Sequence, residues 1–64
     1  MDWLNLLKVM MLDEKAAQAK YQLAVDLAKD PEVRAVFERL RDEEVVHLQL
    51  LEGEYVRLEK GLKA

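Results

Sequence analysis

The chain has 64 residues, 52% hydrophobic and 36% charged, which is enough for one small domain over residues 1–64. It contains no cysteine, which excludes a disulfide framework and any cysteine-based zinc or iron–sulfur site. The chain has ten basic and 13 acidic residues, and the basic residues form no cluster, so nucleic acid is not an expected partner. A single core of this size supplies only about 3–5 kcal/mol, so we expect self-association, a bound metal, or both.

Targeting and membrane signals are absent from the sequence. No apolar run approaches the roughly 20 residues that span a bilayer. The segment from Met1 to Lys8 lacks the basic start and the small-residue cleavage site of a signal peptide. The sequence therefore predicts a cytoplasmic protein that does not use a membrane as a partner.

Two long helices are predicted in chain order, the first over about 2–29 and the second over about 31–60. Both segments are rich in Leu, Ala, Glu, Lys, Gln and Arg, which favour helices. Asp30 suits an N-cap and Pro31 suits the first helical position, so the second helix should begin there. Gly53 is a candidate kink inside the second helix, and Gly61 is a candidate C-cap.

Each predicted helix carries an apolar stripe with steps of three or four residues, which places the stripe on one face. The first stripe comprises Trp3, Leu7, Met10, Glu14, Ala17, Tyr21, Val25 and Ala28. The second comprises Val33, Phe37, Leu40, Glu44, His47, Leu51, Tyr55, Leu58 and Leu62. A short turn between the helices predicts an all-α, antiparallel helical hairpin. One hairpin cannot cover both stripes, so we expect a homodimer, or a higher homo-oligomer, built as a four-helix bundle.

Three polar residues, Glu14, Glu44 and His47, interrupt the apolar stripes. At about 1.5 Å of rise per residue, they lie roughly 24, 21 and 25 Å along their helices from Asp30 in the predicted turn. The three side chains should therefore meet at one level of the hairpin. A buried carboxylate is costly unless it is paired or bound to a metal.

The chemistry of these three residues favours a metal site. Glu44 and His47 form an E-x-x-H pair, whose spacing places both side chains on one helix face. Carboxylate oxygen together with imidazole nitrogen suits iron, manganese or zinc better than calcium or magnesium. A two-fold dimer would contribute four Glu and two His residues. Four carboxylates balance the charge of two divalent ions, so the expected cofactor is two metal ions per dimer.

These residues resemble the ferritin-like superfamily of di-iron carboxylate proteins, in particular rubrerythrin and bacterioferritin. The segment Asp42–His47 is similar to the D-E-E-x-x-H segment of that superfamily, and Glu14 matches its single-Glu helix. Tyr21, seven residues after Glu14, matches a tyrosine that recurs beside the metal site. Ala17 stands where rubrerythrins carry an additional Glu, so the ligand set is closer to that of bacterioferritin. The chain corresponds to half of the usual bundle.

The resemblance implies a site with two iron ions per dimer, or manganese or zinc in their place. Glu44 would bridge the metals, and Glu14 and His47 would bind terminally. It also implies an oxidoreductase that reacts with O2 or H2O2 as a ferroxidase or peroxidase. Tyr21 would fill the core, orient a ligand of the partner chain through its hydroxyl, or take a redox role near the iron.

A second interpretation of the three polar residues requires no metal. Glu14, Glu44 and His47 would then be hydrogen-bonded core residues that set the register of a purely structural helical-hairpin dimer or interaction module.

Overall fold

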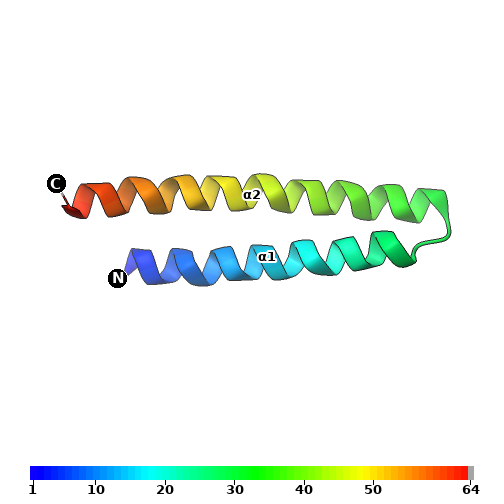
Figure 1. Ribbon diagram of the computed structural model, residues 1–64, viewed down its shortest axis with the longest axis horizontal. Coiled ribbons are helices and arrows are strands. Elements are labelled where there is room, and N and C mark those ends of the chain that lie inside the picture. The colour runs from blue at the N-terminus through cyan, green and yellow to red at the C-terminus, as the bar shows by residue number, and fades with distance from the viewer. Residues whose placement is uncertain (64) are drawn as a thin grey trace.

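The computed structural model describes residues 1–63 as an antiparallel hairpin of two helices (Figure 1). Helix α1 spans Trp3–Leu27 and helix α2 spans Pro31–Lys63. The hairpin measures 51 × 14 × 14 Å, so it is a rod one helix pair thick. The two helices pack along their shared length, which confirms the predicted all-α hairpin.

Side-chain caps fix where each helix begins. The Asp2 carboxylate accepts a hydrogen bond from the backbone N–H of Asn5 at 3.1 Å, which satisfies a free donor in the first turn of α1. Asp30 does the same for α2, because its Oδ1 accepts from the N–H groups of Glu32 at 2.8 Å and Val33 at 3.1 Å. The predicted N-cap at Asp30 is therefore confirmed.

The turn between the helices is three residues long. Helix α1 ends at Leu27, two residues before the predicted end, because Ala28 already has extended geometry with φ −70° and ψ 122°. The Arg34 guanidinium donates to the carbonyl oxygen of Ala28 at 2.6 Å. This hydrogen bond links the first turn of α2 to the residue that follows α1, and it holds the turn closed.

Helix α2 continues past both glycines, where a kink and a C-cap were predicted. Gly61 lies inside the helix, and no residue of the described chain has the positive φ of a glycine C-cap. The helix therefore runs to Lys63 rather than to about residue 60. A Cβ built on Gly53 or on Gly61 would meet nothing within 4 Å, so packing does not require either glycine.

The contact line between the helices differs in part from the predicted stripes. Leu4 and Met11 of α1 are partly buried, whereas Trp3 and Met10 are 56% and 39% exposed. On α2, Leu48 is partly buried and the His47 side chain is 52% exposed. Trp3, Met10 and His47 therefore flank the contact line. Within one hairpin, the only buried residue of the described chain is Leu7.

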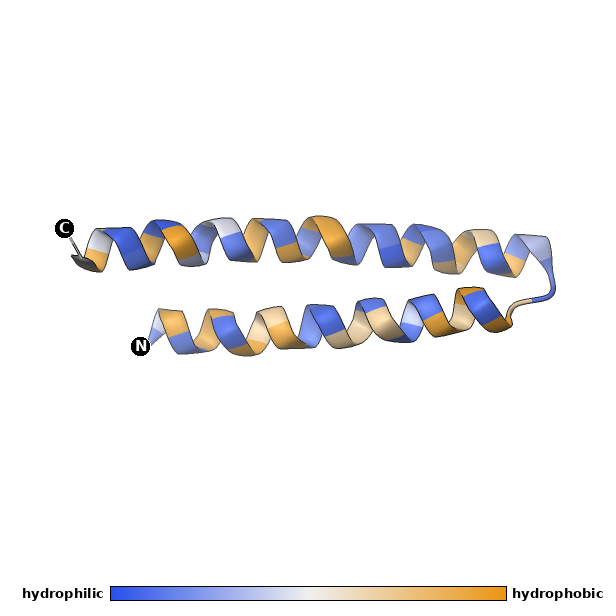
Figure 2. Cartoon of the chain, in the orientation of Figure 1, coloured by the Kyte–Doolittle hydropathy of each residue, from blue (hydrophilic) through white to orange (hydrophobic). Residues whose placement is uncertain are grey.

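The two flanks of the contact line differ in polarity. Residues spaced by seven lie on the same side of a helix. Each flank of the hairpin is therefore formed by one such row of residues from α1 and one from α2. We call one side the open flank; it comprises Trp3, Met10, Ala17 and Ala24 of α1, and Val33, Leu40, His47, Glu54 and Gly61 of α2. We call the other side the polar flank; it comprises Met1 before α1, Lys8, Lys15 and Gln22 of α1, and Glu38, Val45, Glu52 and Glu59 of α2. Figure 2 shows hydrophobic residues recurring along the whole length of both helices.

Candidate metal centre

Glu14, Glu44 and His47 meet at one level between the helices, as the sequence predicted. One ligand atom from each residue lies within 4.8 Å of the other two. Glu14 comes from the middle of α1, and Glu44 and His47 come from one turn in the middle of α2. Two uninterrupted helices with a short, closed turn between them fix this register.

His47 faces both carboxylates. Its Nδ1 atom lies 3.6 Å from Oε2 of Glu14 and 3.7 Å from Oε2 of Glu44. Both separations are longer than the roughly 2.7–3.2 Å of a hydrogen bond from nitrogen to oxygen. The three groups thus converge without bonding one another, and the space between them is bordered by one nitrogen and two carboxylate oxygens.

The Glu14 carboxylate has one oxygen atom without a hydrogen-bond partner in the described chain. This atom, Oε2, is buried. A buried, unpartnered acceptor costs about 1–3 kcal/mol, and more when the group is charged. A cation held between Glu14, Glu44 and His47 would satisfy this oxygen. The donor set of two carboxylates and one imidazole also suits iron, manganese or zinc, so the residues present fit a divalent metal.

Exposure around the centre is uneven. The side chains of Glu14 and Glu44 are 25% and 17% exposed, whereas His47 is 52% exposed. The centre is therefore shielded by α1 and α2 on one side and accessible from the open flank. The sequence alone did not reveal this asymmetry, because the stripe pattern placed all three residues in the interior.

Tyr21 lies on the turn side of the centre. Its ring packs against Phe37 with a centroid distance of 6.3 Å and an interplanar angle of 31°. Seven residues separate Tyr21 from Glu14, which corresponds to about 10 Å along the helix. Within one hairpin, the described contacts of Tyr21 are those of a packing residue, and its predicted bond to a ligand from a partner chain stays a prediction.

A second charged pair lies two turns beyond His47, where Glu54 belongs to the open flank. The Arg57 guanidinium donates hydrogen bonds to Oε1 of Glu54 through Nε at 3.0 Å and also through Nη2. These bonds hold the pKa of the Glu54 carboxyl below its ordinary value. Glu54 therefore stays ionised at neutral pH, with a neighbouring cation that balances its charge.

Comparisons with family models, with curated proteins and with solved structures find no match to this chain. The likeness to the ferritin-like superfamily therefore depends on Glu14, Tyr21 and the segment Asp42–His47 alone. Neither helix, within the described residues, has a stretch long and apolar enough to cross a membrane.

Proposed function

We propose that the chain is a metal-binding protein whose Glu14, Glu44 and His47 hold divalent iron, with manganese or zinc as alternatives. The observation that carries the proposal is the buried, unpartnered Oε2 of Glu14, which faces an imidazole nitrogen and a second carboxylate. Carboxylates in an interior are stable when a cation compensates them. The two-carboxylate, one-imidazole set matches the chemistry of non-haem iron better than that of calcium.

We also propose that a homodimer completes the centre. One hairpin supplies three ligand residues and leaves its centre accessible beside His47, on the flank where Trp3 and Met10 are exposed. A second hairpin packed on the open flank would cover these residues and add its own three ligands. Six ligand residues suffice for two divalent ions, and four carboxylates balance their charge.

The chemistry proposed for this dimer is oxidation of iron by O2 or H2O2. Glu14, Glu44 and His47 of the two chains would hold the two Fe²⁺ ions, which would supply the two electrons that, with two protons, reduce H2O2 to two water molecules or O2 to H2O2. The chain provides the ligands and their spacing, and the paired hairpins limit access of water. Tyr21 is proposed to orient a ligand across the dimer interface.

The competing proposal is a structural dimer without metal. His47 lies within 4 Å of both carboxylates, and a protonated His47 would form ion pairs with Glu14 and Glu44. Such a cluster would set the register of the dimer. The two proposals differ in a measurable quantity, which is the number of metal ions that the folded protein binds.

The deciding experiment is an anaerobic Fe²⁺ titration of the metal-free protein, with the molar mass measured on the same sample by light scattering. We expect a dimer that saturates near one Fe²⁺ per chain and gains near-ultraviolet absorbance when air is admitted. A folded dimer that binds no Fe²⁺, Mn²⁺ or Zn²⁺ would favour the structural proposal.

Two neighbouring carboxylates provide a matched pair of variants. Glu44→Ala removes a proposed ligand, and we expect stoichiometric binding to disappear. Glu43→Ala removes the adjacent carboxylate, which is 49% exposed and pairs with Arg39 at 3.2 Å, and we expect binding to persist. Two metal ions per dimer in the Glu44→Ala protein would contradict the ligand assignment.

A further inference from the structure

We infer that the two hairpins of the dimer run in opposite directions, so that the open end of each hairpin receives the turn end of its partner. This inference rests on the dimer of the proposed function and adds its orientation. The proposed occupant of the cleft at the open end is a second copy of this chain. Its contacting residues are those beside the turn, including Leu27 and Val33.

The first observation is the level of the metal centre along the hairpin. Helix α1, Trp3–Leu27, has its midpoint at residue 15, and Glu14 is one residue away. Helix α2, Pro31–Lys63, has its midpoint at His47. A two-fold axis perpendicular to the helices reverses the direction of the second hairpin. If this axis passes through the shared metal centre, the two hairpins overlap along nearly their full length only when the centre lies near the middle of both helices. A two-fold axis along the hairpin would allow the centre to lie at any level, so the central position favours the perpendicular axis.

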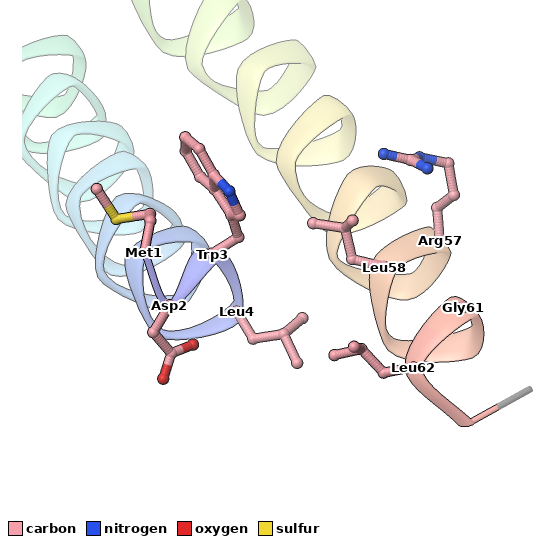
Figure 3. Close-up of a pocket in the computed structure, with 8 residues that line it drawn as sticks. All are labelled: Met1, Asp2, Trp3, Leu4, Arg57, Leu58, Gly61 and Leu62. Carbon is pink, nitrogen blue, oxygen red and sulfur yellow. The ribbon is translucent and has the colours of Figure 1, made fainter.

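The second observation is an apolar cleft at the open end of the hairpin. Figure 3 shows Leu4 of α1 and Leu58 and Leu62 of α2 pointing toward one another, with Trp3 beside them. Trp3 is 56% exposed and Leu62 is 75% exposed, although both lie at this cleft. Large apolar side chains left in water at a preformed hollow favour a binding surface.

The third observation is that the turn end carries exposed apolar residues at matching levels. An axis through the centre passes at Glu14 on α1 and midway between Glu44 and His47 on α2. Trp3, at the cleft and on the open flank, is then within two residues, about 3 Å, of the level of the partner's Leu27, and Leu58 is level with the partner's Val33. In the single hairpin Trp3 is 56% exposed, Leu27 is 70% exposed and Val33 is 45% exposed. One rotation therefore brings apolar side chains of the two ends to matching levels.

The size of the open flank is comparable to that of a standard protein interface. A face of 51 × 14 Å has a flat footprint of about 700 Å², close to the roughly 800 Å² per partner of a standard protein interface. The polar flank does not offer the same surface, because it carries Lys8, Lys15 and three glutamates. The charge of Glu54 on the open flank is balanced by Arg57 within the same helix.

Pulsed electron–electron double resonance measures the distance between spin labels and tests the orientation. The labels are attached to single-cysteine variants, and the absence of native cysteine makes each labelling position unique. Glu32→Cys and Val46→Cys lie on one outward line of α2, two heptads apart, and both native residues are exposed. In the antiparallel dimer the two Val46→Cys labels are nearly level. The two Glu32→Cys labels are offset by about 40 Å along the axis, from about 27 residues of separation at about 1.5 Å per residue.

The expected difference in label-to-label distance follows from this offset, and the distances are measured on the metal-free dimer. The Glu32→Cys label distance should exceed that of Val46→Cys by roughly 20 Å or more, once the sideways separation of the labels is included with the helical rise. Similar distances for the two variants would overturn the antiparallel arrangement. A monomeric mass with no dipolar coupling at either position would overturn the dimer itself. Iron titration of the same labelled samples separates the two proposals, because an antiparallel dimer that binds no metal contradicts only the proposed function.

A cross-linking experiment provides a second, independent measurement. Chains carrying Leu58→Cys are mixed with chains carrying Val33→Cys and treated with a short bismaleimide. The antiparallel dimer should give mainly the mixed product, because these two positions are level across the interface. A parallel dimer should instead give products that join Val33→Cys to Val33→Cys and Leu58→Cys to Leu58→Cys, and that outcome would overturn the inference.

Discussion

Replacement of Glu14 by leucine should stabilise the metal-free protein, against the usual effect of substitution in a helix interface. The buried Oε2 of Glu14 has no hydrogen-bond partner, and such an atom costs about 1–3 kcal/mol. Because the side chain is 25% exposed, we take the lower part of this range, about 1–2 kcal/mol. For a small domain this gain corresponds to a rise of about 4–16 °C in Tm.

The order of stabilities should reverse when metal is present. Metal at about 100 times its Kd adds about 2.7 kcal/mol to a protein that binds it only when folded. The parent chain should gain this amount with Fe²⁺ or Zn²⁺, and Glu14→Leu should gain nothing. The assay is urea unfolding followed by circular dichroism at one fixed protein concentration, with and without metal.

Glu43→Leu is the matched control for this prediction. Glu43 is exposed and pairs with Arg39 on the surface, so we expect a change within about 0.5 kcal/mol and an unaltered response to metal. A metal-free Glu14→Leu protein that unfolds at lower urea than the parent would refute the reasoning, because it would mean that the Glu14 carboxylate is stabilising without a cation.

Three further predictions address the hairpin itself. Leu7→Ala should lower the free energy of unfolding by about 2–4 kcal/mol, measured in urea, because Leu7 is 7% exposed; Leu12→Ala, at 65% exposure, should cost far less. Gly53→Ala should raise the free energy of unfolding by about 0.5–1 kcal/mol, since the added methyl group meets open space; a loss would show that another chain approaches there. The lowered pKa of Glu54 means that its pair with Arg57 is fully present above the ordinary carboxyl pKa and is lost as pH falls through the lowered value. Carboxyl NMR titration should show the Glu54 pKa returning upward in Arg57→Gln.

The sequence predicted the hairpin well because its signals are local. Asp30 and Pro31 mark the start of α2, and the capping bonds of Asp30 form as expected. The meeting of Glu14 with Glu44 and His47 followed from counting residues on either side of one short turn. The prediction that Gly61 caps the C-terminus of α2 was wrong. A glycine C-cap adopts positive φ, whereas Gly61 stays helical.

Burial was harder to predict than register. Trp3 and Met10 share a stripe with Leu7, yet a single α2 neighbour is too narrow to cover all three side chains. The stripe pattern shows which residues avoid water but not which neighbour covers them. For the same reason, the half-exposed His47 could not be distinguished from the more shielded Glu14 by sequence alone.

The presence of a single buried residue, Leu7, in the described hairpin has a consequence for regulation by abundance. In the proposed dimer, a hairpin with so little interior would gain most of its stability from its partner, so folding and association would form one equilibrium. For the proposed dimer, the concentration of assembled sites at low abundance rises with the square of the chain concentration. Doubling synthesis of the chain would then raise metal-holding capacity about fourfold until dimerisation saturates.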